Sequence, residues 1–379
     1  MNLPPIVPVV QRPEAIPYVY ASEANWLLTC PLHVVFDHDR NVRRMRPNTA
    51  SMLLGTAAHV ALAALTSAKG RGFQVRSAAA TREVAALAFD DALARECKRR
   101  DAQIAERGRV PGDSTEPPSA LPFFTMTRAR ISRLADQRFG GRWLWPLPLI
   151  RDHSPHATST LPPRVADIAS EIPLRSRDGL VRGVADSIVR AADGPVIEEF
   201  KTGELTPDRV KEWSRQLIVY AKLYHDEYGF APNVLRIVSL HGPTREIPYV
   251  EEEASAAVAE ICAALSSLNQ ELAAGNSLDS LARPSAAACS YCSHRPWCEA
   301  YWSSKAPGAE GSDVEGVVVN VDGYEVDLQT DSGAELRVAF RDLRLTAPVG
   351  SVLRICGGRS RPDSHVRCDR STTVWRTRS

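Results

Sequence analysis

Residues 180–203 read LVRGVADSIVRAADGPVIEEFKTG, and this stretch decides the core of the fold. Apolar residues alternate along 180–191 and again along 195–201, and Asp193-Gly194 separates the two runs. Such alternation predicts strands, and an Asp-Gly pair between two strands is typical of a tight hairpin turn. The sequence therefore predicts two adjacent antiparallel strands that bring Asp186 and Glu199 together at one end of a sheet.

Two carboxylates at the end of a sheet suit a divalent metal ion. Asp186 and Glu199 offer the oxygen ligands that Mg²⁺ or Mn²⁺ prefers. Lys201 stands two residues after Glu199, so on a strand the two side chains point to the same side, and Glu198 points to the other. The ammonium of Lys201 could orient an attacking water or stabilise charge on a phosphate. A surface hairpin with an ordinary Glu/Lys pair is the competing interpretation.

The flanking sequence predicts a mixed α/β core around this hairpin. A third strand is expected at about 164–174, joined to the pair by a turn at Arg177-Asp178-Gly179, and two more strands between 233 and 250. Helical periodicity marks the stretches 21–37, 49–68, 81–107, 127–139, 207–229 and 251–274. This order of elements indicates an α/β fold in which helices flank a small mixed sheet.

Three polar side chains on the predicted helices are candidates for the same site. His59 lies on the apolar helix 49–68, where a histidine is more often a satisfied core residue than a ligand. Gln216 and Tyr220 are four residues apart and hence share one helix face. Taken alone they would be a solvated glutamine and a half-buried tyrosine. Their joint order around the hairpin is what favours a common role.

Four of the eight cysteines frame this region. Cys30 stands near the start, and Cys289, Cys292 and Cys298 follow far along the chain with the spacing C-x2-C-x5-C. Four thiolates can bind Zn²⁺ tetrahedrally, although structural zinc modules usually close over short loops. Spacing alone leaves zinc and an iron-sulfur cluster open. The remaining cysteines are expected to be free or buried thiols: Cys97, Cys262, Cys356 and Cys368.

The ordered series resembles the RecB-type branch of the PD-(D/E)XK nuclease superfamily. The residues that match are His59, Gly183-Val184-Ala185-Asp186, Glu199-Phe200-Lys201-Thr202-Gly203 and Gln216-Leu217-Ile218-Val219-Tyr220. The cysteine frame is similar to the iron-sulfur subgroup, which includes the AddB nuclease domain, CRISPR adaptation nucleases and exonuclease V-like enzymes. The likeness covers about residues 20–303 and implies a restriction-endonuclease-like core.

The resemblance also implies a role for each matched residue. It makes His59, Asp186 and Glu199 ligands of Mg²⁺ or Mn²⁺, with the backbone carbonyl of Phe200 as a further ligand and Lys201 as the catalytic lysine. Gln216 and Tyr220 would support the site and contact the DNA backbone. The four framing cysteines would hold a [4Fe-4S] cluster with a structural role: Cys30, Cys289, Cys292 and Cys298.

Composition divides the chain into a nuclease domain at 1–305, a linker at 306–312 and a small β-rich, barrel-like module at 313–379. A helical insert is expected at about 70–160, where Arg128, Arg130, Arg133, Arg138 and Arg142 are candidates for phosphate contacts or for a solvated helix face. The module could bind single-stranded nucleic acid through Arg337, Arg341, Arg344 and Arg354, or serve only for stability. The Arg- and Ser-rich tail from 358 is expected to pack poorly.

The charges of 46 Lys and Arg and 45 Asp and Glu nearly cancel, so DNA binding would need a local groove. No run approaches the roughly 18 apolar residues of a membrane span, and a cytoplasmic protein is expected. The sequence thus predicts a metal-dependent DNA nuclease that acts on single strands or DNA ends in repair, recombination or phage defence. The alternatives are a binding subunit of a larger helicase–nuclease or defence complex, inactive alone, and a zinc-stapled structural protein. The chain has no Walker-type Gly-x4-Gly-Lys-Ser/Thr motif, so a helicase would be a separate partner.

Overall fold

The hairpin predicted around Asp193-Gly194 lies at the centre of a six-stranded sheet, where β3 (Val181–Ala191) and β4 (Gly194–Lys201) pair antiparallel. The structure is a computed structural model that describes residues 6–66, 78–107, 113–139, 167–191, 193–203, 205–240, 242–290, 292–304, 313–341, 344–361, 364–369 and 372–377. Gly194 has a φ of +126°, which glycine tolerates without strain. The predicted hairpin is therefore confirmed.

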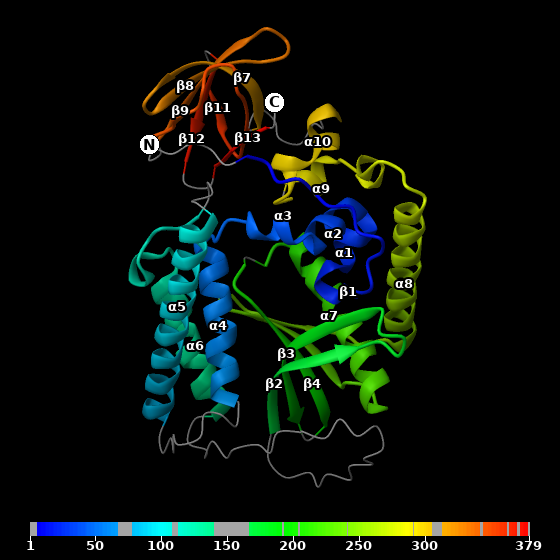
Figure 1. Ribbon diagram of the computed structural model, residues 1–379. Coiled ribbons are helices and arrows are strands. Elements are labelled where there is room, and N and C mark those ends of the chain that lie inside the picture. The colour runs from blue at the N-terminus through cyan, green and yellow to red at the C-terminus, as the bar shows by residue number, and fades with distance from the viewer. Residues whose placement is uncertain are drawn as a thin grey trace.

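Four further strands complete this sheet (Figure 1). β2 (Asp167–Arg175) pairs antiparallel with β3, and the turn between them reaches a φ of +73° at Gly179, as the Arg-Asp-Gly signal predicted. β5 (Val234–Ser239) pairs parallel with β4, and β6 (Thr244–Ile247) pairs antiparallel with β5. The short β1 (Val19–Tyr20) pairs parallel with β3. The sheet is thus mixed, as expected.

Two long helices follow the hairpin. α7 (Pro207–Tyr228) packs on the sheet, and α8 (Glu251–Ala273) packs against α7. The hydroxyl of Thr206 accepts a hydrogen bond from the backbone N–H of Arg209, and Pro207 occupies the first helical position, where no N–H is needed. These local signals fix the start of α7 and hence which of its residues face the sheet.

Three helices form a bundle on the other side of β4. They are α4 (Ala50–Thr66), α5 (Ala78–Arg107) and α6 (Phe124–Phe139), with the short η2 (Pro118–Ala120) between the last two. Their apolar core is continuous with the sheet, because Phe200 is buried in it. The described part of the predicted insert at 70–160 is therefore helical, and its remaining residues lie outside the described ranges.

Within 21–37 the sequence predicts a short helix that opens at Ser22 and runs into Cys30-Pro31, and the structure has helical turns on both sides of that point. These turns belong to η1 (Ala21–Glu23), α1 (Ala24–Thr29) and α2 (Pro31–His38), and α3 (Arg40–Arg44) follows. Cys30 stands at the break with φ of −153° and ψ of 87°. The residue before a proline is pushed out of the helical region by the proline ring, so Cys30-Pro31 interrupts the helix. Cys30 therefore lies between two helices and not within one.

The domain that contains the six-stranded sheet ends in short elements. These are η3 (Leu278–Leu281), α9 (Ala286–Ser290), η4 (Arg295–Trp297) and α10 (Glu299–Ser304). Leu281 and Trp297 are buried in the same apolar core as Leu27 and Leu32 of the N-terminal helices. The two ends of this domain are thus packed together, as Figure 1 also shows.

A separate seven-stranded sheet lies at one end of the molecule (Figure 1). Its strands are β7 (Val314–Asp322), β8 (Glu325–Gln329), β9 (Glu335–Phe340), β10 (Val352–Cys356), β11 (Arg359–Arg361), β12 (His365–Cys368) and β13 (Thr373–Arg376). The order is β11-β12-β9-β8-β7-β10-β13, and no pairing of β11 with β13 closes it among the described strands. The expected β-rich module is present as an open sheet with its own apolar core.

The prediction that the tail after residue 358 packs poorly is wrong. β13 pairs with β10, and Trp375 on β13 is 1% exposed. The two adjacent apolar residues Val374 and Trp375 are both buried, but the many arginines nearby dominate the composition of the tail. Burial of a tryptophan outweighs a composition that is typical of disorder.

The module is fastened to the short elements that follow α8. Arg354 is 4% exposed; its guanidinium bonds to Glu299 at 2.6 and 2.8 Å, contacts Glu315 and donates to the carbonyl of Pro296. Arg295 pairs with Asp313 at 3.1 Å. Arg354 therefore cannot serve in a nucleic-acid groove, contrary to the expectation from its charge, and it joins the module to η4 and α10 instead.

Candidate metal and active site

The site forms where β3 and β4 diverge. Their register ends at Ser187 opposite Glu198, so Asp186 and Glu199 are the next residues on the two strands. The backbone N–H of Phe200 donates a 2.7 Å hydrogen bond to Oδ2 of Asp186. The carboxylate thus accepts a hydrogen bond that a backbone carbonyl would accept in a continuous strand pair. Asp186 is 8% exposed and Glu199 is 3% exposed. The divergence therefore buries two carboxylates side by side, as the hairpin pattern predicted.

His59 reaches this point from α4. Its Nδ1 lies 3.0 Å from Oδ1 of Asp186, and its Nε2 lies 3.2 Å from the carbonyl oxygen of Phe200. Burial lowers the pKa of His59, but the charge and hydrogen bond of Asp186 raise it more, to about 9. The protonated ring then donates to both acceptors. A cationic imidazolium thus lies between two of the groups predicted to bind a cation.

Lys201 and Gln216 form the second half of the site. Nζ of Lys201 lies 2.8 Å from Oε1 of Glu199 and 3.0 Å from Oε1 of Gln216. The amide nitrogen of Gln216 donates to Oε1 of Glu199 at 2.9 Å and to the hydroxyl of Tyr220 at 2.8 Å. The two residues of α7 therefore hold the Glu199–Lys201 pair in place. Both are buried, at 8% and 4% exposed, which favours the predicted supporting role and not the predicted contact with the DNA backbone.

One oxygen of Glu199 has no protein partner. Oε2 is buried and accepts no hydrogen bond from any described residue. Burial and the charge of Asp186 raise the pKa of Glu199 to about 8, against the opposing effects of Lys201 and His59. An orphaned buried acceptor is costly unless something unseen satisfies it. A divalent cation between Asp186 and Glu199 would do so, and hard oxygen donors fit Mg²⁺ or Mn²⁺.

Glycines allow the close packing behind the site. A Cβ atom at Gly183 would lie 2.3 Å from Cε1 of Tyr220, and one at Gly203 would lie 2.5 Å from a guanidinium nitrogen of Arg209 and 3.3 Å from Trp213. The glycines of GVAD and EFKTG are therefore explained by α7, which passes close to both strands. A larger residue at 183 would push the ring of Tyr220 away from Gln216.

The sequence interpretation missed Glu171 on β2. Its carboxylate, a nitrogen of His59 and a carboxylate oxygen of Asp186 all lie within 4.8 Å of one another, a geometry that can hold a metal ion. Glu171 has a φ of +54°, rare for a residue with a side chain. The signal was present in the turn at Arg177-Asp178-Gly179, since hairpin register counted from that turn places residue 171 opposite 186.

The four framing cysteines line one pocket, beside Trp26, Leu32 and Phe36 of the N-terminal helices: Cys30, Cys289, Cys292 and Cys298. Burial, together with the charges of the neighbouring cysteines, raises the pKa of the thiols of Cys292 and Cys298 to about 12. None of the eight cysteines, all within the described ranges, forms a disulfide. Four converging thiols in an apolar pocket fit a soft metal or an iron-sulfur cluster, which would supply the positive charge that stabilises thiolates.

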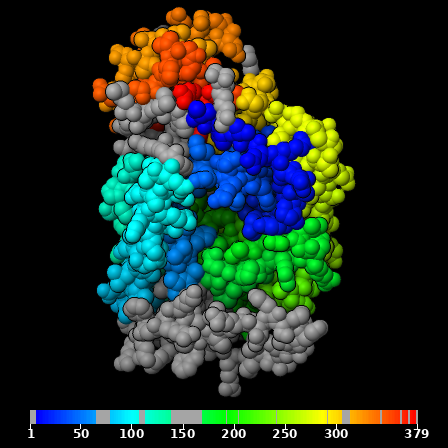
Figure 2. Space-filling model, in the orientation of Figure 1, coloured from blue at the N-terminus to red at the C-terminus, as the bar shows by residue number. Residues whose placement is uncertain are grey.

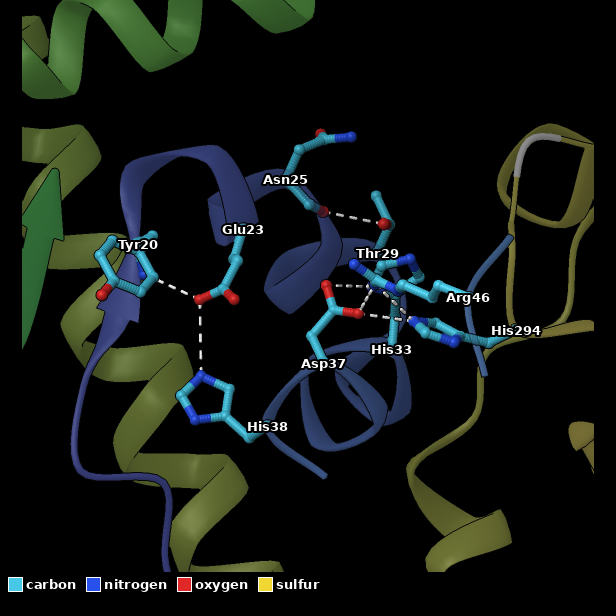
Figure 3. A network of polar contacts seen from close by, with 9 residues as sticks. All are labelled: Tyr20, Glu23, Asn25, Thr29, His33, Asp37, His38, Arg46 and His294. Atoms are coloured by element: carbon cyan, nitrogen blue, oxygen red, sulfur yellow. Dashed lines mark hydrogen bonds and ion pairs between the residues drawn. The ribbon is translucent and has the colours of Figure 1, made fainter. Parts of the chain in front are cut away.

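A polar network ties the two halves of this pocket together (Figure 3). Asp37 on α2 lies 2.6 Å from Nε2 of His294 and 3.4 Å from Nδ1 of His33. The guanidinium of Arg46 contacts both Asp37 and His294. Burial lowers the pKa of His294 well below the ordinary value, and that of His33 to about 3, so both rings are neutral. Since Arg46 already supplies the positive charge, this cluster is best explained as a brace between α2 and the segment that contains Cys292 and Cys298.

The described arginines of the insert differ in their surroundings. Arg128 pairs with Asp90 of α5 at 2.9 Å, and burial lowers the pKa of Arg130. Arg133 is exposed. The side chain of Arg138 and all of Arg142 lie outside the described parts of the chain. The solvated or paired interpretation therefore fits Arg128, and phosphate contact stays a prediction for Arg133.

The arrangement as a whole suits hydrolysis at a surface hollow. In the space-filling view the surface is hollowed between the insert helices and the N-terminal segment, and the green atoms of the central sheet region lie at its floor (Figure 2). Carboxylates and an imidazole are present for a metal, and a lysine lies beside them. These are the groups that phosphodiester hydrolysis requires.

No helix in the described part of the chain has both the length and the apolar character needed to cross a bilayer.

No curated protein matched the chain. The family model for the PD-(D/E)XK nuclease superfamily matches residues 21–299, which include both strands of the hairpin, α7 and all four framing cysteines. The chain belongs to the PD-(D/E)XK nuclease superfamily.

Proposed function

We propose that this protein is a metal-dependent nuclease that hydrolyses phosphodiester bonds in DNA, on single strands or at ends, and that it belongs to the iron-sulfur, RecB-type branch of its superfamily. The observation that supports this most directly is the convergence of His59, Asp186, Glu199 and Lys201 from three elements onto one buried point. A structural hairpin would not need an unpartnered carboxylate oxygen beside a charged histidine.

Each side chain has a defined task in this reaction. Asp186, Glu199 and His59 would hold Mg²⁺ or Mn²⁺, with the Phe200 carbonyl close by. When bound, the ion supplies Lewis-acid activation of water and neutralises charge on the phosphate. Lys201, fixed by two hydrogen bonds, presents its remaining N–H to the attacking water or to a phosphate oxygen.

Gln216 and Tyr220 act indirectly. Gln216 bonds to both members of the Glu199–Lys201 pair, and Tyr220 fixes the amide orientation of Gln216. This arrangement keeps the lysine close to the carboxylate before substrate arrives, so little reorganisation is needed during the reaction.

The test is cleavage of labelled DNA by anaerobically purified protein with Mn²⁺ or Mg²⁺, on linear single strands, linear duplexes and end-blocked duplexes. Lys201→Met should lower the cleavage rate by about 10²-fold or more. The control is Lys222→Met, which removes a lysine of α7 that pairs with Asp226 of the same helix and should leave the cleavage rate unchanged. Absence of cutting on every substrate, or equal cutting by Lys201→Met, would overturn the proposal. Cutting that requires an added helicase would instead support a subunit of a larger complex.

We further infer that the four framing cysteines hold a [4Fe-4S] cluster. Their convergence on one pocket supports a shared metal centre, and the resemblance to the iron-sulfur subgroup favours iron over zinc. Iron and acid-labile sulfide in the purified protein are the expected result. Stoichiometric zinc without iron would overturn the choice of metal but not the nuclease assignment.

A further inference from the structure

Three carboxylates lie in one row across three strands. The register of β2 on β3 runs from Asp167 opposite Arg190 to Arg175 opposite Arg182, and the one position without a pair is Glu171 opposite Asp186. On the other side of β3, the register that ends at Ser187 opposite Glu198 places Glu199 next to Asp186. Like charges directly opposite one another destabilise a sheet. A cation bound between these carboxylates would therefore reduce their mutual repulsion.

The existing cations do not balance this row once all three carboxylates are ionised. Glu171, Asp186 and Glu199 then carry three negative charges, whereas His59 and Lys201 are the two cationic side chains in contact with Asp186 and Glu199. Glu171 forms no ion pair or hydrogen bond with any described residue, and Oε2 of Glu199 is orphaned and buried. Glu171 itself is exposed, and partial desolvation together with the charge of Asp186 raises its pKa, as expected for a carboxylate that faces others.

The backbone supports the same conclusion independently. A φ of +54° at Glu171 is a strained conformation for a residue with a β-carbon, and it occurs where the ladder to β3 is interrupted. Strain of this kind persists where the surrounding structure imposes it, often at functional positions. Here it accompanies a carboxylate within metal-binding distance of His59 and Asp186.

We propose that Glu171 is a fourth metal-binding side chain of this site, contributed by β2 in addition to His59, Asp186 and Glu199. The proposal rests on the metal-dependent function proposed above. It makes the site one with three carboxylates and one imidazole, and places the metal on the side of Asp186 that faces β2. Glu171 would then help to determine how tightly the ion is held.

The test measures Mn²⁺ binding to the full-length, metal-stripped protein by electron paramagnetic resonance of free Mn²⁺. The apparent Kd should rise about tenfold or more in Glu171→Gln and stay unchanged in Glu335→Gln, which alters an exposed strand glutamate of β9. Asp186→Asn serves as the positive control for lost binding. Wild-type affinity in Glu171→Gln together with weak binding in Asp186→Asn would overturn the role of Glu171 and leave the nuclease proposal standing.

Wild-type affinity in both variants would instead overturn the metal site as a whole. Thermal unfolding in EDTA provides a readout that does not depend on bound metal. Glu171→Gln should unfold at the same or a higher temperature than the wild type, because it removes a charge opposite Asp186. Addition of Mn²⁺ should then raise its unfolding temperature less than that of the wild type. A fall in the metal-free unfolding temperature with an unchanged Mn²⁺ response would show that Glu171 is structural and would overturn the proposal.

Discussion

Nδ1 of His59 on α4 lies 3.0 Å from Oδ1 of Asp186 on β3, and this contact joins the three-helix bundle to the central sheet at the candidate active site. The same ring reaches the carbonyl of Phe200 through Nε2. In the absence of a divalent ion the imidazolium supplies the positive charge that the carboxylates need. Metal binding must therefore compete with a proton on His59.

The first prediction concerns the pH dependence of the metal-free protein. Burial lowers and Asp186 more strongly raises the pKa of His59, to about 9, above the ordinary value near 6.5. The stabilisation is therefore complete below pH 6.5 and is lost as the pH rises through about 9. Urea unfolding in EDTA should show on the order of 2–3 kcal/mol less stability at pH 10 than at pH 6 from this group. The difference should vanish in His59→Gln, and an equal loss in that variant would contradict the assignment.

The second prediction is that Glu199→Gln separates stability from function. Because burial and Asp186 raise the pKa of Glu199 to about 8, above the ordinary carboxyl value, ionisation destabilises the metal-free fold as the pH rises from about 4.5 to 8. In EDTA at pH 8.5 the variant should unfold at equal or higher urea concentration than the wild type, and it should lose Mn²⁺ binding and cleavage. Lower stability of the variant at pH 8.5 would show that the charged form is favoured in the fold.

The third prediction tests the packing behind the site. Gly183→Ala places a methyl group against the ring of Tyr220, and overpacking of this kind costs about 1–3 kcal/mol. The ring should move away from Gln216 and loosen Lys201, so the cleavage rate should fall while Mn²⁺ affinity changes little. Tyr220→Ala removes the clashing ring, and a double-mutant cycle should give strongly non-additive unfolding free energies. Additive effects would mean that the two residues do not interact.

The fourth prediction concerns the thiol pocket. Cys30→Ser removes the one ligand from the N-terminal segment, so iron content and the visible absorption of the protein should fall first. Cleavage should decline only as the N-terminal helices loosen, which limited proteolysis near α1 and α2 can follow. Cys262→Ser is the control, because Cys262 lies outside the pocket. Full iron content in Cys30→Ser would remove Cys30 from the ligand set.

The fifth prediction concerns the C-terminal module. Arg354 is buried, whereas its partners Glu299 and Glu315 are 57% and 26% exposed, so the expected cost is that of losing charge-assisted hydrogen bonds, about 1.5–3 kcal/mol. Arg354→Met should therefore make the chain more sensitive to proteases between α10 and β7 and should lower its unfolding temperature. Arg337→Met, which removes an exposed pair with Asp327, should change neither. Equal behaviour of the two variants would show that Arg354 does not fasten the module.

Much of this architecture follows from local sequence signals. The Asp-Gly turn, the alternation on either side of it and the capping of α7 by Thr206 and Pro207 each depend on neighbours in the chain. The turn and the alternation predicted the hairpin, and the spacing of four residues placed Gln216 and Tyr220 on one helix face. The break at Cys30 also follows from a neighbour in the chain, since Pro31 restricts the residue before it.

Other features depended on partners that are distant in the chain. The sequence around Arg354 suggests a surface charge, but the folded chain places Glu299 and Glu315 against it. The composition of the tail suggests poor packing, but Trp375 packs beside Trp297. Glu171 carries no motif of its own, and its meaning comes from the row that it completes with Asp186 and Glu199.

The sequence by itself determined the residue types of the site and the strand pair that presents them, because turn chemistry and a period of two act over a few residues. The tertiary structure alone decided which groups from distant segments meet these carboxylates. It brought His59 to Asp186 and Gln216 to Glu199, and it left one oxygen of Glu199 without a described partner. Electrostatic interactions depend on distance and burial, and the packing of α4, β2 and α7 around β3 and β4 sets both.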